Sequence, residues 1–399
     1  MLLQIVDDVL IGFEKHSSTI LVLLDMSAAF DTVDIQKLLS ILETKLNIRG
    51  TALKWFSSFL LNRKQKVLVN GQLSDVLLTL YGVPQGSVLG PVLFNIYVSC
   101  LPSFIEELGF LSSMYADDTN ARKQFALRFQ LYNISVKVPF VIEQITKWMA
   151  TYFLKVNPSK TEIILFSPSS MKSVPKIQGI FVNDGCIRFS DSVRLLGVQF
   201  DCNLNFDNHV TKLVSECWYH IRNIQKIRRY LTTDELKKLV HAVISSKIDY
   251  CNSILYGVKA STISKLQTVQ NEAAKVICRP RPGSTISDQA FEELHWLKIK
   301  ERIVFKMLLL VHKFFVGKAA HYFVDYLLVK CPAKRLLYTN FMDTVSGRRS
   351  FYYASPRLWN HLPEKTRLED DAEKFKKLLK SALFQNYYNI MQCVQMYYA

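Results

Sequence analysis

The amino-acid sequence predicts an α+β fold in which a region of interleaved strands and helices is followed by a mostly helical region. Short apolar, β-branched runs alternate with amphipathic segments in the first half of the chain, whereas helical spacing of apolar residues dominates from residue 208 onward. The composition is 49% hydrophobic and 21% charged, as in ordinary folded proteins. A chain of 399 residues is long enough for two or three domains.

The first half contains the predicted strands. Residues 19–24 form a β-branched apolar run that ends at Asp25, so this run is a buried strand that delivers a carboxylate at its end. Further strands are expected at 111–115 and 161–166, a hairpin at 66–80 with Asn70-Gly71 at its turn, and another hairpin at 193–200. Helices are expected at 35–61, 88–98 and 141–153.

The second half is predicted to be helical to about residue 278. Two prolines and a glycine make residues 279–284 the best candidate for a linker, with further helices after it. The most apolar later stretch, residues 303–317, is interrupted by Lys306, His312 and Lys313. It therefore predicts a core helix and not a membrane span.

The charge balance favours a polyanionic partner. The net charge is +16 and the pI is about 9.4, and neutralising phosphates releases condensed counterions. A membrane surface would also attract such a chain, and a basic protein without an anionic partner is the plain alternative.

The cysteines and the N-terminus indicate the cellular compartment in which the chain is expected. None of the eight cysteines forms a Cys-x-x-Cys pair, which argues against a zinc knuckle or a dithiol redox motif. The N-terminus has no basic region and carries Asp7 and Asp8 where a signal peptide would be apolar. We expect reduced thiols and a nuclear or cytoplasmic location, not secretion.

Carboxylates at strand ends are the first candidates for chemistry. Asp25 ends one predicted strand, and Asp117 and Asp118 end another. Oxygen ligands of this kind suit Mg²⁺, and two such ions can stabilise the attacking and leaving oxygens in phosphoryl transfer. A lone Asp-Asp pair is more often a turn or a helix cap, so the pair alone does not establish a site.

Five motifs occur in a fixed order, and together they carry a family resemblance. They read DMSAAFDTVD from Asp25, GVPQGSVLGPVLF from Gly82, YADD from Tyr115, LKVNPSKTE from Leu154 and LLGV from Leu195. This series resembles the reverse transcriptases of LINE-type (non-LTR) retrotransposons, over about residues 1–280. Group II intron maturases share the Asp-Asp turn but differ in the glycine-rich motif, which favours the LINE family.

The resemblance implies the architecture and the partners. The fold would be a right-hand polymerase palm, an antiparallel sheet with helices on one face, spanning residues 1–207. A helical thumb would follow at 208–280 and a mostly helical C-terminal region at 281–399. The activity would be that of an RNA-directed DNA polymerase acting on template RNA, a DNA primer and deoxynucleoside triphosphates, with two Mg²⁺ ions and no membrane.

The resemblance also implies roles for individual residues. Asp25 and Asp117 would bind the metal ions, supported by Asp118. Phe30 would exclude a ribose 2′-hydroxyl, although ordinary core packing is its alternative. Gln85 and Gly86 would lie against the incoming nucleotide, unless they are only turn residues. Lys160 would protonate the leaving pyrophosphate, or else be a solvated surface lysine.

Two departures from the family affect the expected activity. Only 24 residues precede Asp25, so we expect a fragment that lacks the fingers and the upstream endonuclease. After Asp118 the family has an apolar return strand, whereas residues 120–124 read NARKQ; a misplaced strand would shift the metal site. We therefore expect weak or no polymerase activity from this chain alone. The alternatives are a catalytically dead nucleic-acid-binding remnant and an unstable degenerate product.

Overall fold

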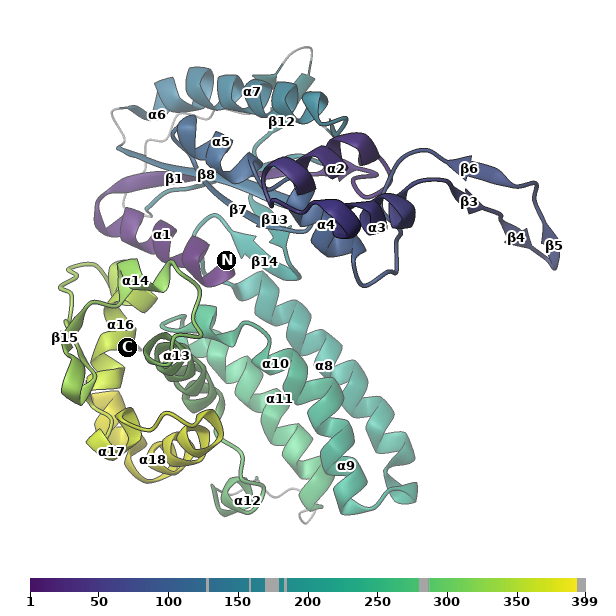
Figure 1. Cartoon of the computed structure of the whole chain (residues 1–399). Coiled ribbons are helices and arrows are strands. Elements are labelled where there is room, and N and C mark those ends of the chain that lie inside the picture. Colours follow the sequence, from purple (N-terminus) through teal and green to yellow (C-terminus); the bar gives the residue numbers. More distant parts are fainter. Residues whose placement is uncertain are drawn as a thin grey trace. The chain divides into compact units, whose positions relative to one another are not determined.

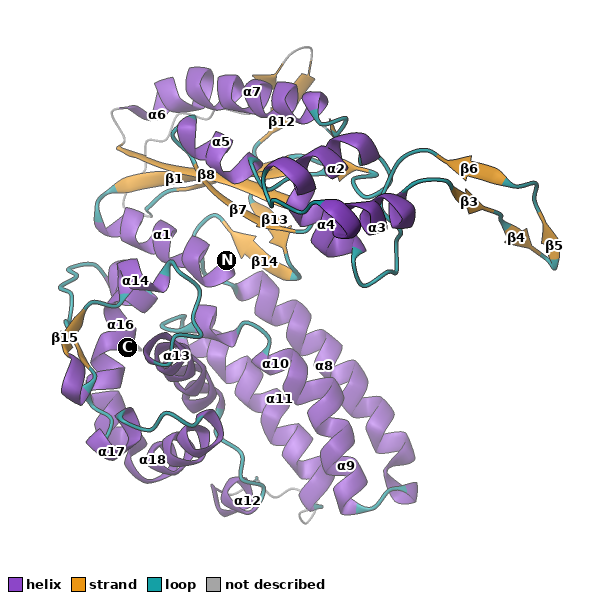
Figure 2. Ribbon diagram, in the orientation of Figure 1, coloured by secondary structure: helices purple, strands orange, loops and turns teal. Residues whose placement is uncertain are grey.

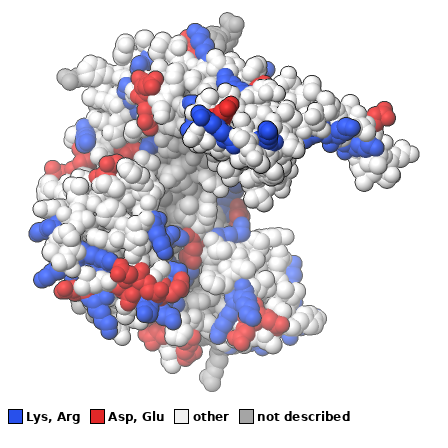
Figure 3. Space-filling view, viewed as in Figure 1, with Lys and Arg blue, Asp and Glu red and all other residues white. Residues whose placement is uncertain are grey.

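A computed structural model describes residues 1–126, 129–157, 159–168, 179–182, 185–279, 286 and 288–392. The chain divides into two compact units. The first, Ser18–Asp191, is called the sheet unit; the second, which joins Met1–Ser17 to Ser192–Ala399, is called the helical unit. Figure 1 follows the chain through both units, Figure 2 gives their secondary structure, and Figure 3 shows Lys and Arg interspersed with Asp and Glu on the visible face.

The sheet unit is built on a four-stranded sheet with the strand order β10-β1-β8-β7. The strands are β1 (Ser17–Leu24), β7 (Leu111–Tyr115), β8 (Asp118–Ala126) and β10 (Glu162–Phe166). β1 pairs antiparallel with β10, and β7 pairs antiparallel with β8. The strand expected at 111–115 has the predicted bounds, and those expected at 19–24 and 161–166 agree to within two residues.

One face of β1 builds the core of this unit. Alternate residues Ile20, Val22 and Leu24 are buried in a cluster that also contains apolar side chains of helices. The helices of the sheet unit are α2 (Ile35–Thr44), α3 (Gly50–Leu60), α4 (Gly90–Tyr97), α5 (Leu101–Glu107), α6 (Gln130–Tyr132) and α7 (Val138–Thr151), with a π-helical turn at Asn133–Lys137. The predicted α+β architecture is confirmed. The helix expected at 35–61 is two helices, because Asn47, between them, and Gly50, at the start of α3, take positive φ values.

A narrow two-stranded arm extends from the sheet unit (Figure 1). It consists of β3 (Arg63–Gln65) paired with β6 (Leu77–Thr79) and β4 (Leu68–Val69) paired with β5 (Gln72–Leu73). Asn70 and Gly71 turn it with φ values of 49° and 82°, as a tight hairpin turn requires. The hairpin predicted at 66–80 is therefore confirmed. Short pairs β2 (Met26–Ser27) with β9 (Lys155–Val156) and β11 (Gly179–Val182) with β12 (Gly185–Arg188) complete the unit.

After α1 (Leu2–Glu14), the helical unit continues with the hairpin of β13 (Ser192–Leu195) and β14 (Val198–Asp201), which confirms the hairpin predicted at 193–200. Its other elements are α8 (Asp207–Ile227), α9 (Thr233–Val240), a π-helical turn η4 (His241–Ser245), α10 (Ser246–Asp249), the 3-10 turn η5 (Asn252–Leu255), α11 (Ala260–Cys278), α12 (Asp288–Glu293), α13 (Ile299–Phe315), α14 (Phe323–Tyr326), β15 (Val329–Cys331), β16 (Leu336–Leu337), α15 (Val345–Arg348), α16 (Phe351–Asn360), α17 (Glu364–Arg367) and α18 (Ala372–Gln392).

Packing within the helical unit buries one face of each long helix. α8 packs against α11, and α13 packs against α16 and α18. The stretch predicted as a core helix is α13, with Ile303, Met307 and Val311 buried. In the part of the chain that is described, no helix is long and apolar enough to cross a bilayer. Most of the predicted linker, residues 280–284, lies outside the described residues.

The N-terminal helix α1 (Leu2–Glu14) belongs to the helical unit and is held there by acidic side chains. Asp7 is buried and accepts hydrogen bonds from the backbone N–H groups of Phe351 and Tyr352, at 2.6 and 3.0 Å. Burial raises the pKa of Asp7 to about 8, although both N–H donors act to lower it. Glu14 accepts from the N–H and the hydroxyl of Thr344, at 3.0 and 2.5 Å. The N-terminal helix is thus tied to the C-terminal region.

The division into a palm at 1–207, a thumb at 208–280 and a C-terminal region at 281–399 is a functional one, and it stays a prediction. By packing alone, α1 and the β13–β14 hairpin group with the later helices.

Candidate active site

Asp25 lies directly after β1, at the point where the buried strand ends. Its side chain is half-exposed, and its backbone carbonyl accepts a hydrogen bond from the N–H of Asn157 at 2.8 Å. The pairing of Met26 with Val156 in β2 and β9 continues this contact. Two segments that are 130 residues apart in the sequence are therefore held side by side.

This pairing brings Lys160 to Asp25. The ammonium group of Lys160 lies 3.8 Å from Asp25 Oδ2. Both side chains are well exposed, so the ion pair contributes little to stability. Its significance is positional, because it places a proton donor beside a candidate metal ligand.

Ala116 and Asp117 form the turn that joins β7 to β8, and Asp118 is the first residue of β8. Tyr115 pairs with Asp118 across the hairpin, and Ala116 takes a φ of 53° at the turn. Both aspartate side chains are accessible to solvent, and no donor among the described residues contacts either carboxylate. The turn presents two carboxylates whose oxygens are not used within the described fold.

Asp25 and Asp118 lie on neighbouring strands of the sheet. Asp25 directly follows β1, and Asp118 begins β8, the strand next to β1. The pKa of Asp118 is raised by desolvation and further by the negative charges of Asp117 and Asp25.

The donor chemistry of these residues suits a divalent metal, but they do not form a ready-made cage. In the described ranges no group of three or more His, Cys, Asp or Glu side chains is arranged to hold a metal ion. Mg²⁺ is usually held by one or two carboxylates together with waters and substrate phosphates. An open pair of carboxylate-bearing strand ends fits that mode of binding.

The return strand after Asp118 corrects one expectation from the sequence. Residues 120–124 do not disrupt the hairpin, since β8 runs from Asp118 to Ala126 and pairs in continuous register with β7 from Asp118 to Arg122. Arg122 is buried and donates to Ser113 Oγ at 2.8 Å, and Asn120 donates to the Ser113 carbonyl at 2.9 Å. The polar side chains are accommodated because polar partners on β7 face them. The apolar alternation expected there was too strict a requirement.

The glycine-rich loop folds onto the segment that follows Asp25. The N–H of Val83 donates to the Phe30 carbonyl at 2.9 Å. A Cβ on Gly82 would lie 2.9 Å from backbone atoms of Phe30 and Asp31, and the φ of this glycine is +83°. Only glycine allows this close approach. The loop is thus locked to the neighbourhood of the carboxylates.

Gln85 and Gly86 lie at the tip of this loop. Gln85 donates from Nε2 to Asp31 Oδ1 at 2.8 Å, which fixes the orientation of its amide. Gly86 has a φ of +75°, and a Cβ there would meet no atom within 4 Å. The backbone conformation favours glycine at this position, while the space beside it is open.

Phe30 lies between the core and a pocket. Its ring stacks on Phe94, with centroids 4.7 Å apart. Phe30 also lines a pocket of about 550 Å³ together with Tyr115 and Ala116. The structure therefore brings the predicted steric gate to the hairpin of Asp117 and Asp118, while the stacking also gives Phe30 a core contact.

Two residues of this site were missed in the sequence. Asp31 orients Gln85, and the acid-rich segment from Asp25 to Asp34 was the signal that could have identified it. Arg63 donates from Nε to the Leu60 carbonyl at 3.0 Å and from its guanidinium to the carbonyls of Tyr81 and Gly82. It anchors the glycine-rich loop from the base of the arm, and no local sequence pattern indicates this contact.

Comparison of the sequence with those of known proteins identifies a matching family model and several relatives. Residues 4–200 match the family model described as "Reverse transcriptase (RNA-dependent DNA polymerase)". The chain is 25% identical over 286 residues to the probable RNA-directed DNA polymerase from transposon BS of Drosophila melanogaster, covering 67% of this chain and 30% of that protein. It is 25% identical over 283 residues to the RNA-directed DNA polymerase from mobile element jockey of Drosophila funebris, covering 69% and 30%.

The chain spans about 30% of the length of these relatives. Among solved structures, the telomerase of Candida albicans in complex with a fragment of telomeric RNA has a TM-score of 0.36 and 12% identity, covering 74% of this chain and 52% of that one. Apo telomerase of Candida tropicalis, truncated from its C-terminal domain, has a TM-score of 0.34 and 16% identity, covering 50% and 38%. Likeness at this level does not bear on function.

Proposed function

The chain carries a reverse transcriptase domain of the LINE (non-LTR retrotransposon) type, and from this premise we propose that it catalyses RNA-directed DNA synthesis. One observation supports the proposal most directly. Asp25, directly after β1, and Asp118, at the start of the neighbouring strand β8, have accessible side chains, as has Asp117 beside them. Such a group of carboxylates is what a nucleotidyl transfer site requires.

Different residues have different roles in the proposed reaction. A primer 3′-hydroxyl attacks the α-phosphorus of a deoxynucleoside triphosphate, and pyrophosphate leaves. Asp25 and Asp117 would hold two Mg²⁺ ions, supported by Asp118; when bound, these ions stabilise the attacking and leaving oxygens. Lys160, held beside Asp25 at 3.8 Å, donates a proton to the leaving pyrophosphate.

The surrounding residues select and position the nucleotide. Phe30 lines the pocket beside the turn, where its ring would exclude a ribose 2′-hydroxyl. Gln85, oriented by Asp31, and Gly86, with open space beside it, would lie against the incoming nucleotide. Template RNA, a DNA primer and deoxynucleoside triphosphates are the proposed partners, in agreement with the net charge of +16.

A nuclear or cytoplasmic location is part of this proposal. None of the eight cysteines forms a Cys-x-x-Cys pair, and we expect reduced thiols, as is usual for proteins in reducing compartments.

The proposal is tested by primer extension on poly(rA)/oligo(dT) with Mg²⁺, comparing the chain with its Asp117→Ala variant. We expect at most weak incorporation from this chain alone, and we expect EDTA and the Asp117→Ala change each to abolish it, because the variant loses several kcal/mol of transition-state stabilisation. The matched control is the Asp75→Ala variant, which changes an exposed residue of the arm. This variant should extend the primer as well as the unchanged chain does.

The other outcome is equally informative. If the folded chain incorporates nothing yet binds RNA with a salt-dependent affinity, it is a nucleic-acid-binding remnant without catalysis. Circular dichroism on each protein excludes an unfolded sample as the cause.

A further inference from the structure

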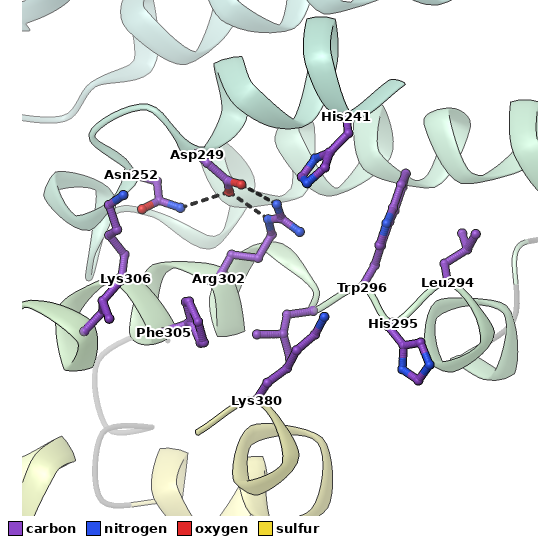
Figure 4. A pocket seen from close by; sticks show the side chains of 12 residues that line it. His241, Asp249, Asn252, Leu294, His295, Trp296, Arg302, Phe305, Lys306 and Lys380 are labelled. Carbon is purple, nitrogen blue, oxygen red and sulfur yellow. Dashed lines mark hydrogen bonds and ion pairs between the residues drawn. The ribbon is translucent and has the colours of Figure 1, made fainter. Parts of the chain in front are cut away.

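A second pocket lies within the helical unit, apart from the residues of the candidate active site. Its volume is about 410 Å³, within the range of pockets that hold small ligands. His241 of η4 and Asp249 of α10 line one side. Trp296, in the loop before α13, and Lys380 of α18 line the other, and Figure 4 shows both side chains directed toward the space beside Arg302.

The charge in this pocket is positive. Asp249 is the one acidic residue that lines it, and it is already paired with Arg302, which donates from Nε at 2.8 Å and from a second guanidinium nitrogen. Lys306 and Lys380 have no acidic partner in the described part of the chain. Burial and the charge of Arg302 lower the pKa of Lys380. A bound anion would relieve this repulsion.

The pocket also offers an aromatic surface. Trp296 is half-buried and stacks on no other ring of the described residues, and Phe305 lies across from it (Figure 4). Stacking on an indole ring stabilises a flat base, and Arg and Lys beside the ring hold the phosphate. A ligand that uses both features is aromatic and anionic, which is the chemistry of a nucleotide.

We propose that this pocket binds one unpaired nucleotide of an RNA strand, with the base against Trp296 and the phosphate near Arg302 and Lys380. Lys306, at the opposite side beside Asn252 (Figure 4), lies where an adjoining phosphate would pass. A single strand is required because base faces are accessible to side chains only when they are unstacked. Binding here needs neither a metal ion nor a deoxynucleotide, so it does not depend on polymerase activity.

The test measures binding of a fluorescent 12-nucleotide RNA to the full chain in EDTA, by fluorescence anisotropy at several salt concentrations. Trp296→Ala should weaken binding by about fivefold or more, since stacking of one base is lost, and Trp296→Phe should restore most of it. Lys380→Gln should reduce the salt slope by about 0.7, the value for one phosphate on a single strand.

Matched controls separate this site from general charge attraction. Lys377→Gln makes the same charge change at an exposed position on α18 and should bind as the unchanged chain does. An RNA duplex of the same sequence should bind equally well to the Trp296→Ala variant and to the unchanged chain. In the unchanged chain, RNA that contains 4-thiouridine should cross-link to the peptide with Trp296, which decides the matter if a variant fails to fold.

Three results would overturn the proposal. The first is an unchanged affinity in both Trp296→Ala and Lys380→Gln. The second is an equal loss of affinity for duplex RNA in these variants, which would show that binding does not require an unpaired base. The third is Trp296-dependent binding of free 5′-AMP or 5′-UMP as tight as that of the strand, which would make a free nucleotide the ligand.

Discussion

Two Asp-Asp pairs in this chain are the same dipeptide in opposite environments. In the helical unit, Asp7 is buried against the N–H groups of Phe351 and Tyr352, and Asp8 accepts from the Tyr326 hydroxyl at 2.7 Å. In the sheet unit, Asp117 and Asp118 are exposed at a hairpin turn, and no donor among the described residues contacts their carboxylates. A carboxylate that the fold already satisfies is structural, whereas one left open is available to a ligand.

The comparison predicts, first, a large loss of stability when Asp7 is changed. Asp7→Ala should lower the free energy of unfolding by about 2–3 kcal/mol, because two buried N–H groups at the start of α16 lose their acceptor. Urea denaturation followed by circular dichroism measures the loss. Asp117→Ala is the control and should change stability by about 0.5 kcal/mol or less. Equal losses in the two variants would contradict the distinction.

A second effect, smaller per pH unit, is the dependence of the free energy of unfolding on pH. The Asp7 carboxyl has a raised pKa of about 8 in the fold, against an ordinary value of 3.8, so the folded chain binds more protons than the unfolded chain between these pH values. The contribution of the Asp7 carboxyl to the free energy of unfolding is fully present below pH 4. It is lost as the pH rises to about 8, by up to about 1.4 kcal/mol per pH unit.

Urea denaturation between pH 5 and pH 9 tests this sign. As the pH rises, the free energy of unfolding of the unchanged chain should fall relative to that of its Asp7→Asn variant. The difference between the two proteins should level off above pH 8. Parallel curves for the two proteins would show that Asp7 does not carry this dependence.

The smallest effect on stability is expected at the exposed pair. Asp118→Asn removes one of the charges that repel one another at the turn, so the free energy of unfolding at pH 7 should be unchanged or rise by about 0.5 kcal/mol at most. Primer extension by the same variant should nevertheless fall sharply. A variant that is destabilised like Asp7→Ala would place Asp118 among the structural residues.

Much of the sheet unit could be predicted from local pattern. The strand before Asp25, the Asn70-Gly71 turn and the YADD hairpin follow from β-branched runs and turn residues, which act over a few positions. The return strand could not be read in this way. Its apolar alternation is broken at Asn120 and Arg122, and the facing Ser113 on β7 accepts hydrogen bonds from both of these side chains.

The residues of the candidate site come from motif order, and their roles stay predictions. Motif order selected Asp25, Asp117, Asp118, Phe30, Gln85, Gly86 and Lys160, and the structure places these residues on adjoining strand ends and loops of one unit. Arg63 was missed because it acts through carbonyls 18 and 19 residues away. Contacts of that kind leave no periodic trace in the sequence.

The sequence by itself determined the family, the α+β class and the residues that carry the proposed chemistry, because these depend on motif order and short-range periodicity. Tertiary structure alone decided which Asp-Asp pair is buried, that α1 is tied to the C-terminal region, and that Trp296 and Lys380 share a pocket with Arg302. These outcomes depend on which groups meet across the fold, and burial, hydrogen-bond satisfaction and charge coupling are set there and not along the chain.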